Sequence, residues 1–312
     1  MGMTLTQLEY IVAIDTHRHF ATAAKKCYIT QPTLSMQVQK LEEELGLKIF
    51  DRSKQPVVPT EAGQEIIHQA RVILAESRKM FELVQEQQNV LSGELRIAII
   101  PTLAPYLLPR FVGNFMRKYP DVKLVAEELQ SSQIITALVN ETIDAGILVT
   151  PLNEPGIEEH PVFYEEFVVY TSPHLPLFKQ ATVQMDHLPS GDMWLLKQGH
   201  CFRNQMENLC KKHDGNQGQQ FSYESGSLET LKKLVEQERG FTLLPELATN
   251  DIPVQYRERL KPFEDPRPVR EVSIVIHRTH LKRRLIELLK NEISNAIPEK
   301  MRRPRENVVA WR

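Results

Sequence analysis

Two cysteines in the second half of the chain, Cys201 and Cys210, are the residues best suited to redox chemistry. A cysteine reacts with a peroxide as its thiolate, and the product is a sulfenic acid that can condense with a nearby thiol. Their separation of nine positions does not by itself indicate a switch, because this spacing alone favours two unrelated buried cysteines. The surrounding sequence therefore has to decide which kind of cysteine they are.

The sequence just before Cys201 favours an ionised thiol. Gly199 predicts that a helix begins after it, and the free N–H groups of a helix N-terminus stabilise an anion. His200 and Arg203 add donating or positively charged groups close to the sulfur. No second Cys or His pair follows at the spacing of a zinc site, so we expect no metal and no cofactor.

The overall composition limits the class of protein that could carry this chemistry. The 312 residues are enough for two or three domains, and the three cysteines are too few for a disulfide framework. We find neither the apolar run of a membrane span nor a signal peptide, and we expect a cytoplasmic protein without a membrane partner. The formal net charge of -2 does not indicate a nucleic-acid partner, so DNA binding has to be argued from local pattern.

Residues 1–60 are predicted to form a winged helix-turn-helix. A short helix of small residues over 21–26 and a turn precede a second helix, for which Thr30 is a good N-cap and Pro32 fits the first turn. The apolar residues of that helix recur at positions 34, 38, 41 and 45, which places them on one face. Residues 57–59 would form a strand of the wing.

The opposite face of the second helix and the wing carry the side chains that we expect to contact double-stranded DNA. Amide and hydroxyl groups pair with base edges in the major groove, and a nearby cation meets phosphates. The expected contacts are Thr30, Gln31, Pro32, Thr33, Ser35, Gln37, Gln39, Lys40 and Arg52. The spacing alone is equally compatible with any small helical domain.

A long helix is predicted over 61–92, where no Gly or Pro follows Gly63. Its apolar positions 66, 70, 73, 80 and 84, together with Ser77, recur at heptad spacing. A lone helix that is polar on its other faces is unstable, so we expect it to pair with its copy in a homodimer. Such a dimer carries two helix-turn-helices and would bind a two-fold operator.

Residues 93–298 alternate short β-branched runs with helices and predict a two-lobed, Rossmann-like α/β domain similar to periplasmic binding proteins. Lobe I would comprise 93–164 and 268–298, and lobe II 165–267, with a ligand bound between them. We expect strands at 95–100, 122–128, 145–149, 166–171, 194–196, near Phe221, at 240–244 and at 272–276, and helices at 103–119, 133–140 and 281–296. The basic tail, 299–312, is expected to be disordered.

Several local motifs extend over nearly the whole chain. In the N-terminal part they are Phe20-Ala21-Thr22-Ala23-Ala24, Gln31-Pro32-Thr33-Leu34-Ser35, Leu41-Glu42-Glu43-Glu44-Leu45-Gly46, Phe50-Asp51-Arg52 and Pro59-Thr60-Glu61-Ala62-Gly63. Together they resemble the LysR-type transcriptional regulators. The resemblance implies a regulator rather than an enzyme, with a multidomain α and α/β fold, promoter DNA and RNA polymerase as partners, and assembly as a homodimer or homotetramer.

The regulatory part is similar to the hydrogen peroxide-sensing activators of that family. The motifs that carry this likeness are Pro101-Thr102 with Pro105-Tyr106-Leu107-Leu108-Pro109, Gly199-His200-Cys201-Phe202-Arg203 with Cys210, Ser227-Leu228-Glu229-Thr230-Leu231 and Leu243-Leu244-Pro245. The resemblance implies that Cys201 reacts with peroxide and that Cys210 resolves the product as a disulfide. In one continuous helix these two residues would lie about 13 Å apart. A disulfide needs Cα atoms within about 7 Å, so residues 202–209 would have to unwind partly.

The same resemblance suggests the lining of a peroxide site. Thr102 and His200 would line it, and Ser131 would supply a second hydroxyl from the next strand end. The arginine that relatives place at the start of the last strand corresponds to Arg270. With Arg203, these groups would hold the peroxide in line with the sulfur and stabilise the leaving oxygen.

Two other functions are compatible with these residues. An ordinary LysR-type regulator would bind a small-molecule inducer between the lobes, and Thr102 and Ser131 would contact an anionic metabolite. A thiol peroxidase would use Cys201 catalytically, but the DNA-binding domain argues against an enzyme. Replacing Cys201 by serine separates the first alternative from peroxide sensing, and turnover of peroxide with a thiol reductant would support the second.

Overall fold

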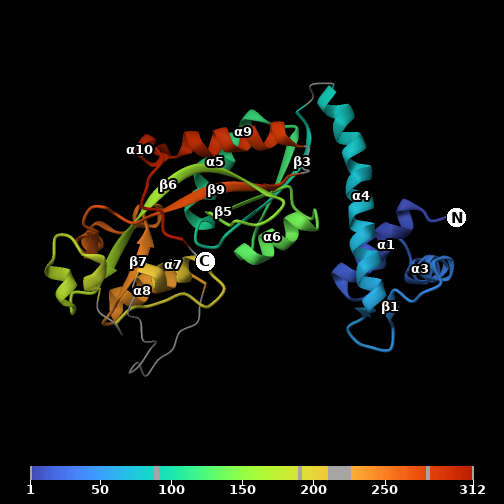
Figure 1. Cartoon of the computed structure of the whole chain (residues 1–312), viewed down its shortest axis with the longest axis horizontal. Helices are drawn as coiled ribbons and strands as arrows, with labels where there is room; N and C mark the ends of the chain where they lie inside the picture. The colour runs from blue at the N-terminus through green and yellow to red at the C-terminus, as the bar shows by residue number, and fades with distance from the viewer. Residues whose placement is uncertain (1, 88–90, 189–191, 210–225, 279–281, 311–312) are drawn as a thin grey trace. The chain divides into compact units, whose positions relative to one another are not determined.

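The computed structural model describes residues 2–87, 91–188, 192–209, 226–278 and 282–310. The chain divides into two compact units, Met1–Val90 and Leu91–Arg312 (Figure 1). Among the described helices, none combines the length and the apolar composition needed to cross a lipid bilayer. Each unit has its own hydrophobic core and is treated separately below.

The first unit is a winged helix-turn-helix followed by a long helix. Its elements are α1 (Leu5–His17), α2 (Phe20–Lys26), α3 (Gln31–Leu45), β1 (Phe50–Asp51), β2 (Val58–Pro59) and α4 (Glu61–Gln87). The side chain of Thr30 accepts a hydrogen bond from Thr33 N, and Gly46 ends α3 in the left-handed conformation. β1 and β2 pair antiparallel and form the small wing. The start of α3 at Gln31 confirms what Thr30 and Pro32 predict.

The N-terminal part of α4 packs into the core of its own unit. Ile67 and Ala70 are buried, and Ile66 and Ile73 lie partly buried against them. Further along, Met80 is 70% exposed. The first half of the predicted heptad seam is therefore covered within the chain, and pairing of α4 with a second copy stays a prediction.

The second unit is built on one mixed sheet with the strand order β4-β3-β5-β9-β6-β7, in which β8 also pairs with β6. The strands are β3 (Gly93–Ile99), β4 (Val122–Glu128), β5 (Ala145–Thr150), β6 (Ile157–Thr171), β7 (Phe241–Pro245), β8 (Leu260–Pro262) and β9 (Val269–His277). β3 pairs in parallel with β4 and β5, as the alternation of strands and helices predicts. The long strand β6 joins the two lobes, because it pairs with β9 over its first part and with β7 and β8 over its last.

Helices cover both faces of the first lobe, with α5 and α9 on one side and α6 on the other (Figure 1). The helices of this unit are α5 (Ala104–Lys118), α6 (Ser131–Val139), α7 (Cys201–Leu209), α8 (Leu228–Gln237), α9 (Arg283–Ala296) and α10 (Glu299–Arg302). Short 3-10 helices occur at Pro176–Lys179, Met185–His187, Glu246–Thr249 and Val254–Arg259.

The second lobe corrects part of the sequence prediction. β6 pairs antiparallel with both β7 and β8, so the described strands of this lobe do not repeat the parallel unit of the first. Residues 194–196 form no strand and follow a single bridge between Met193 and Phe241. The strand expected near Phe221 lies outside the described residues. An apolar run alone does not distinguish a strand from a buried extended segment, which explains these errors.

The described part of the C-terminal tail, residues 299–310, is ordered, contrary to the expected disorder. Val308 forms a bridge with Val269, the first residue of β9, and Val309 packs against the core. The basic composition of the tail suggested a solvated end, but the two valines give it apolar surface to bury.

The substitution Gly63→Ala should destabilise the first unit. A Cβ at this position would lie 2.0 Å from the backbone oxygen of Ile49, so the backbone itself would have to move. We expect the free energy of unfolding to fall by at least about 1–3 kcal/mol, as for other overpacked sites. Thermal unfolding followed by circular dichroism would measure the loss.

Gly113→Ala is the control for this substitution. Gly113 lies in α5, and its added Cβ would meet only the side chain of Arg117 at 3.5 Å. It should be neutral or stabilising by about 0.5–1 kcal/mol, because alanine is the better helix former. If Gly63→Ala is as harmless as Gly113→Ala, the close approach to Ile49 does not limit stability.

Candidate functional site

The sheet topology brings the predicted site residues together from distant parts of the sequence. β3 and β4 are parallel neighbours, so the segments after their carboxyl ends, with Thr102 and Ser131, lie at the same edge. Arg270 stands near the start of β9, and Cys201 is the first residue of α7. All four side chains are buried, with exposed fractions of 3% or less. The sequence therefore identified these four members of one buried cluster.

Arg270 is the charged centre of this cluster. It is fully buried, and its guanidinium donates from Nε to Oε1 of Glu165 at 2.7 Å. Nη1 donates to the hydroxyl of Thr102 at 3.2 Å, and Nη2 to the carbonyl oxygen of Thr102 at 3.4 Å. The guanidinium carbon also lies 5.2 Å from the centre of the Phe202 ring. These contacts fix Arg270 and Thr102 relative to the first turn of α7.

Glu165 is the residue that sequence reasoning missed. It stands directly opposite Arg270 in the β6–β9 register, is fully buried, and its second oxygen accepts from the N–H of Leu247 at 3.1 Å. The signal for it was strand periodicity, because Glu165 alternates in phase with the buried Phe163 and Phe167. A carboxylate at such a position must be paired, since an isolated buried charge is very costly.

The thiol of Cys201 is buried and protonated in this state. Burial raises its pKa above the ordinary value of 9.0, and the nearby Ser131 hydroxyl and the Arg270 charge oppose this less strongly. The expectation of a lowered pKa is therefore wrong for the resting protein, although the helix start after Gly199 is confirmed. Desolvation outweighs the helix terminus, because a thiolate loses its hydration completely in such a site.

Ser131 supplies a hydroxyl with unused hydrogen-bonding capacity. It is the first residue of α6 and is 2% exposed. The hydroxyl is close enough to the Cys201 thiol to favour the thiolate, yet its oxygen has no hydrogen-bond partner of good geometry among the described residues. A small polar molecule beside the thiol would satisfy it, because buried hydroxyls are rarely left without a partner.

His200 lies at the wall of a pocket next to this cluster. The pocket has a volume of about 330 Å³, and its lining also includes Pro101, Tyr106, Glu128 and Gly226. Burial, and to a lesser degree Lys197, lowers the pKa of His200 below its ordinary 6.5. The imidazole is therefore neutral at pH 7 and offers one donor and one acceptor rather than a positive charge.

For two other predicted site residues, Arg203 and Cys210, no contact among the described residues joins them to the Cys201 sulfur. Arg203 donates from Nε to Glu207 at 2.8 Å and from Nη1 to the carbonyl oxygen of Leu196 at 2.8 Å. Its place in a peroxide site stays a prediction. Cys210 lies outside the described residues, which end at Leu209 in this part of the chain.

The predicted DNA-contacting residues lie mainly on the outer face of α3. Thr30, Gln31, Pro32, Thr33, Gln39, Lys40 and Arg52 are exposed, while Ser35 and Gln37 are half-buried. Some of them have partners within the chain. Gln37 accepts from the side-chain amide of Gln7 at 3.3 Å, and Gln39 donates to Glu43 at 3.0 Å.

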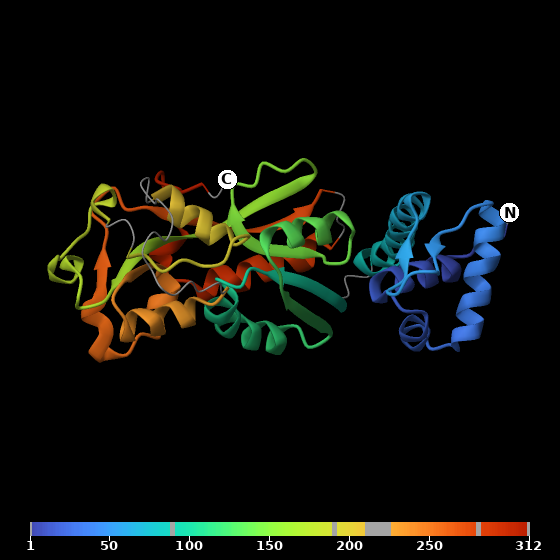
Figure 2. The ribbon, with the colours of Figure 1, turned by 90° about the horizontal axis from the view of Figure 1, so that it is seen from below.

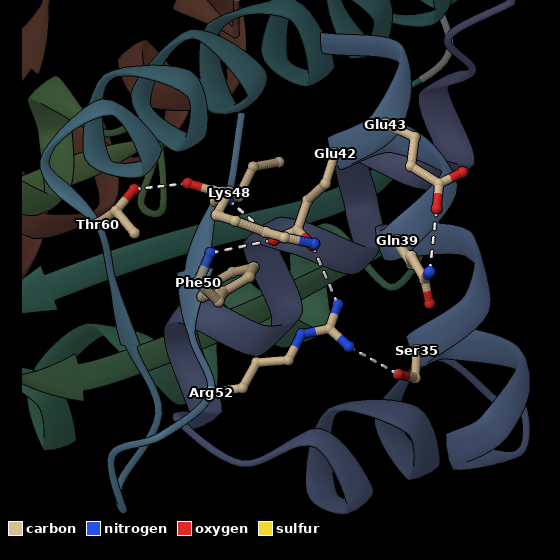
Figure 3. Close-up of polar contacts among 9 residues, drawn as sticks. Ser35, Gln39, Glu42, Glu43, Lys48, Phe50, Arg52 and Thr60 are labelled. Carbon is tan, nitrogen blue, oxygen red and sulfur yellow. Dashed lines mark hydrogen bonds and ion pairs between the residues drawn. The ribbon is translucent and has the colours of Figure 1, made fainter. Parts of the chain in front are cut away.

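The wing is held to α3 by the buried carboxylate of Glu42 (Figure 3). Oε1 accepts from the backbone N–H of Ile49 at 2.9 Å and of Phe50 at 3.3 Å, and Oε2 pairs with Arg52 at 3.2 Å. Arg52 also donates to the hydroxyl of Ser35 at 3.2 Å. Arg52 therefore orients the wing as well as offering a positive charge, a role that its position in the sequence did not suggest.

A groove of about 560 Å³ opens between this wing and the helix-turn-helix. Basic or imidazole side chains line much of it, namely His17, Arg18, His19, Arg52 and Lys54. Gln31 and Ser35 from α3, together with Gln55, add uncharged polar groups to the lining. Cationic and amide groups at one concave surface suit a phosphate backbone with base edges beside it. Arg18, His17 and His19 were missed because they precede the recognised motif.

Comparisons with known proteins agree with both units. Residues 5–64 match the family described as bacterial regulatory helix-turn-helix protein, lysR family, and residues 88–296 match the LysR substrate binding domain. The hydrogen peroxide-inducible genes activator of Haemophilus influenzae is 33% identical over 273 residues, which cover 88% of this chain and 90% of the relative.

Two solved structures are similar over nearly the full length. Full-length OxyR from Pseudomonas aeruginosa, a cysteine variant, has a TM-score of 0.78 at 34% identity and covers 94% of this chain and 98% of its own. A cysteine variant of Corynebacterium glutamicum OxyR with hydrogen peroxide bound has a TM-score of 0.62 at 29% identity, with coverage of 95% and 93%.

The substitution Glu165→Gln should lower the pKa of Cys201. Glu165 neutralises Arg270, so its loss leaves the full positive charge of Arg270 to stabilise a thiolate. The ultraviolet absorbance of the thiolate, titrated with Cys201 as the sole cysteine, would measure this. The Cys201 thiol of the parent should ionise above pH 9.0, and that of the variant at a lower pH than in the parent. Breaking a buried pair should also cost about 3–5 kcal/mol of folding free energy.

Glu166→Gln is the matched control, one position along the same strand. Its carboxylate is 19% exposed and pairs with Arg267 at the surface, so neither the titration nor the stability should change by much. Equal pKa values of Cys201 in both variants would show that Glu165 does not govern the charge next to the thiol.

Proposed function

The chain belongs to the LysR family of DNA-binding transcriptional regulators, and we propose that it senses hydrogen peroxide through oxidation of Cys201. Proteins of this family regulate transcription and are not enzymes. The observation that carries the proposal is the buried thiol with the unpaired Ser131 hydroxyl and the Thr102–Arg270 pair beside it. The peroxide-inducible relatives and the peroxide-bound OxyR structure support the same ligand.

The proposed site is suited to a very small polar molecule. Thr102, Ser131, Cys201 and Arg270 are nearly inaccessible, so a metabolite of many atoms would have to displace them. Hydrogen peroxide needs little more room than a water molecule, and it both donates and accepts hydrogen bonds. The pocket at His200 would serve as its entry, because residues next to Thr102 and Cys201 in the sequence form its wall. This geometry favours peroxide over the small-molecule inducer.

The proposed first step transfers one oxygen atom to sulfur. The sulfur of Cys201 attacks one peroxide oxygen, the O–O bond breaks, and the thiol proton passes to the departing oxygen to form water. Sulfur is oxidised to a sulfenic acid, and the peroxide is reduced. The Ser131 and Thr102 hydroxyls and the neutral His200 would orient the peroxide, and Arg270 would stabilise negative charge as it develops.

The proposed second step forms the disulfide with Cys210, as the sulfenic acid loses its oxygen as water with the thiol proton of Cys210. α7 is continuous from Cys201 to Leu209, so the Cα atoms of these residues lie about 12 Å apart. One further residue can shorten this by only about 3.8 Å. The remaining distance exceeds the roughly 7 Å that a disulfide allows, so α7 has to unwind. This rearrangement would be the signal.

The same proposal includes the partners of the regulator. The exposed face of α3 and the groove beside the wing would bind double-stranded promoter DNA. Pairing of α4 with its copy would give a homodimer. Contacts between the regulatory units of two dimers would give a homotetramer. An activator of this kind would recruit RNA polymerase, and it would act in the cytoplasm, where the chromosome lies.

Peptide mass mapping without reductant, after one equivalent of peroxide, tests the redox step. We expect a Cys201–Cys210 disulfide and a free Cys27. Burial and the nearby Glu9 raise the pKa of Cys27, so it is a poor nucleophile. In Cys201→Ser no disulfide involving residue 210 should appear. Oxidation of Cys27 in place of Cys201 would contradict the mechanism.

Footprinting on a target promoter tests whether oxidation changes DNA binding. We expect oxidation to change which operator half-sites the protein covers, because unwinding of α7 alters the packing of the regulatory unit. Cys201→Ser should give the reduced footprint with or without peroxide. Transcription that peroxide still activates in Cys201→Ser would favour the small-molecule inducer and overturn the proposal.

A further inference from the structure

Residues 307–310 near the C-terminus, here called the C-terminal strap, connect β9 to α7. Figures 1 and 2 both draw the last described residues of the chain near α7. On the strand side, the N–H of Val269 donates to the carbonyl oxygen of Asn307 at 3.0 Å, and the N–H of Val309 donates back to Val269 at 2.8 Å. The strap is thus anchored one residue away from Arg270.

On the helix side, the strap is bound by two amide side chains of α7. Gln205 donates from Nε2 to the carbonyl oxygen of Val309 at 2.7 Å, and Asn208 donates from Nδ2 to that of Ala310 at 2.8 Å. The two residues are three positions apart, so they lie on the same face of an α-helix. Both bonds therefore require α7 to be helical between them.

The Gln205 contact is partly buried and joins a buried side chain of α7 to the strap. Gln205 is fully buried, and its oxygen Oε1 has no hydrogen-bond partner in the described part of the chain. If α7 moved away from the strap, the buried amide of Gln205 would lose the partner of its Nε2 atom, and the partly buried carbonyl of Val309 would lose its donor. Leaving buried polar groups unpaired is more costly than the net gain of an ordinary hydrogen bond.

We propose that the C-terminal strap is a brake on the redox switch, holding α7 in its helical form through Gln205 and Asn208. This inference rests on the proposed function, because the step that it slows is formation of the Cys201–Cys210 disulfide. That step joins the Cys201 sulfenic acid to the Cys210 thiol and releases water, with hydrogen peroxide as the original oxidant. The strap stays on β9 while α7 unwinds, so its bonds to the helix are lost before the disulfide closes.

The strap also links the brake to the peroxide site. Val269 precedes Arg270, whose guanidinium contacts Thr102 and the Phe202 ring at the first turn of α7. The first turn of the helix is therefore held by Arg270 and its last turn by the strap, both from the start of β9. Loss of the strap should leave the peroxide contacts intact and free only the distal end of α7.

Asn208→Ala and Gln205→Met test the brake in the full chain. Each removes one bond to the strap, and each should speed disulfide formation about fivefold once the sulfenic acid has formed, as expected from the loss of one hydrogen bond. A chain that stops after Glu306 should show both effects together. Quenched-flow sampling after excess peroxide, with mass analysis of trapped thiols, separates this step from the first oxidation, whose rate should not change.

Amide hydrogen exchange of α7 in the reduced protein gives a second readout that needs no oxidation. The two side-chain variants and the shortened chain should all exchange faster in the last turns of α7 than the parent. Glu306→Ala is the matched control, because its side chain is exposed and none of its contacts is among those of the strap. It should match the parent in both measurements.

The outcomes separate the brake from the switch itself. If the parent forms no Cys201–Cys210 disulfide, the proposed switch is wrong. If the parent forms it but Asn208→Ala, Gln205→Met and the shortened chain close it no faster than Glu306→Ala, the brake alone is wrong. Unchanged exchange of α7 in all three would likewise overturn the brake. Asn208→Ala alters an exposed side chain, so this variant should fold and can be measured even if the other variants do not fold.

Discussion

The buried ion pair between Glu165 and Arg270 is the constraint on which the regulatory unit depends. Both side chains are fully buried, and together they remove two charges from water at a high desolvation cost. The pair is tolerable because β6 and β9 hold the residues in exact opposition and because Leu247 and Thr102 satisfy the remaining donors and acceptors. Any shift in the register of β6 against β9 would leave a buried charge without its partner. The pair therefore fixes the two strands that join the lobes, and with them the position of the first turn of α7.

The Cys201 thiol lies in this rigid part of the structure, at the start of α7. Burial raises the pKa of Cys201, while Ser131 and Arg270 favour the thiolate less strongly. In the proposed mechanism, such a balance would keep the thiol reduced until a small oxidant occupies the site. The helix that begins at Cys201 is packed along one side and bound at its far end by the C-terminal strap. In the proposed mechanism, contacts that stabilise α7 would therefore oppose the unwinding that the disulfide requires.

A similar device organises the DNA-binding unit. Glu42 is a buried carboxylate that joins α3 to the wing through two backbone N–H groups and Arg52. Here the cation is partly exposed, so it can orient the wing and still face a phosphate. In both units a buried carboxylate, placed by helix or strand periodicity, determines where an arginine side chain points. Neither carboxylate was chosen from the sequence, because an acidic residue in a periodic segment looks like part of a solvated face until its burial is known.

The sequence by itself determined what depends on local chemistry and short spacing. Thr30 and Pro32 predicted the start of the recognition helix, Gly199 predicted the start of α7, and the alternation of strands with helices predicted the parallel half of the sheet. The tertiary structure decided the rest, including the Glu165–Arg270 pair, the antiparallel second lobe, the ordered tail and the raised pKa of Cys201. These properties depend on burial and on partners a hundred or so residues away in sequence. Desolvation acts on a group only through everything packed around it, and no short stretch of sequence contains that information.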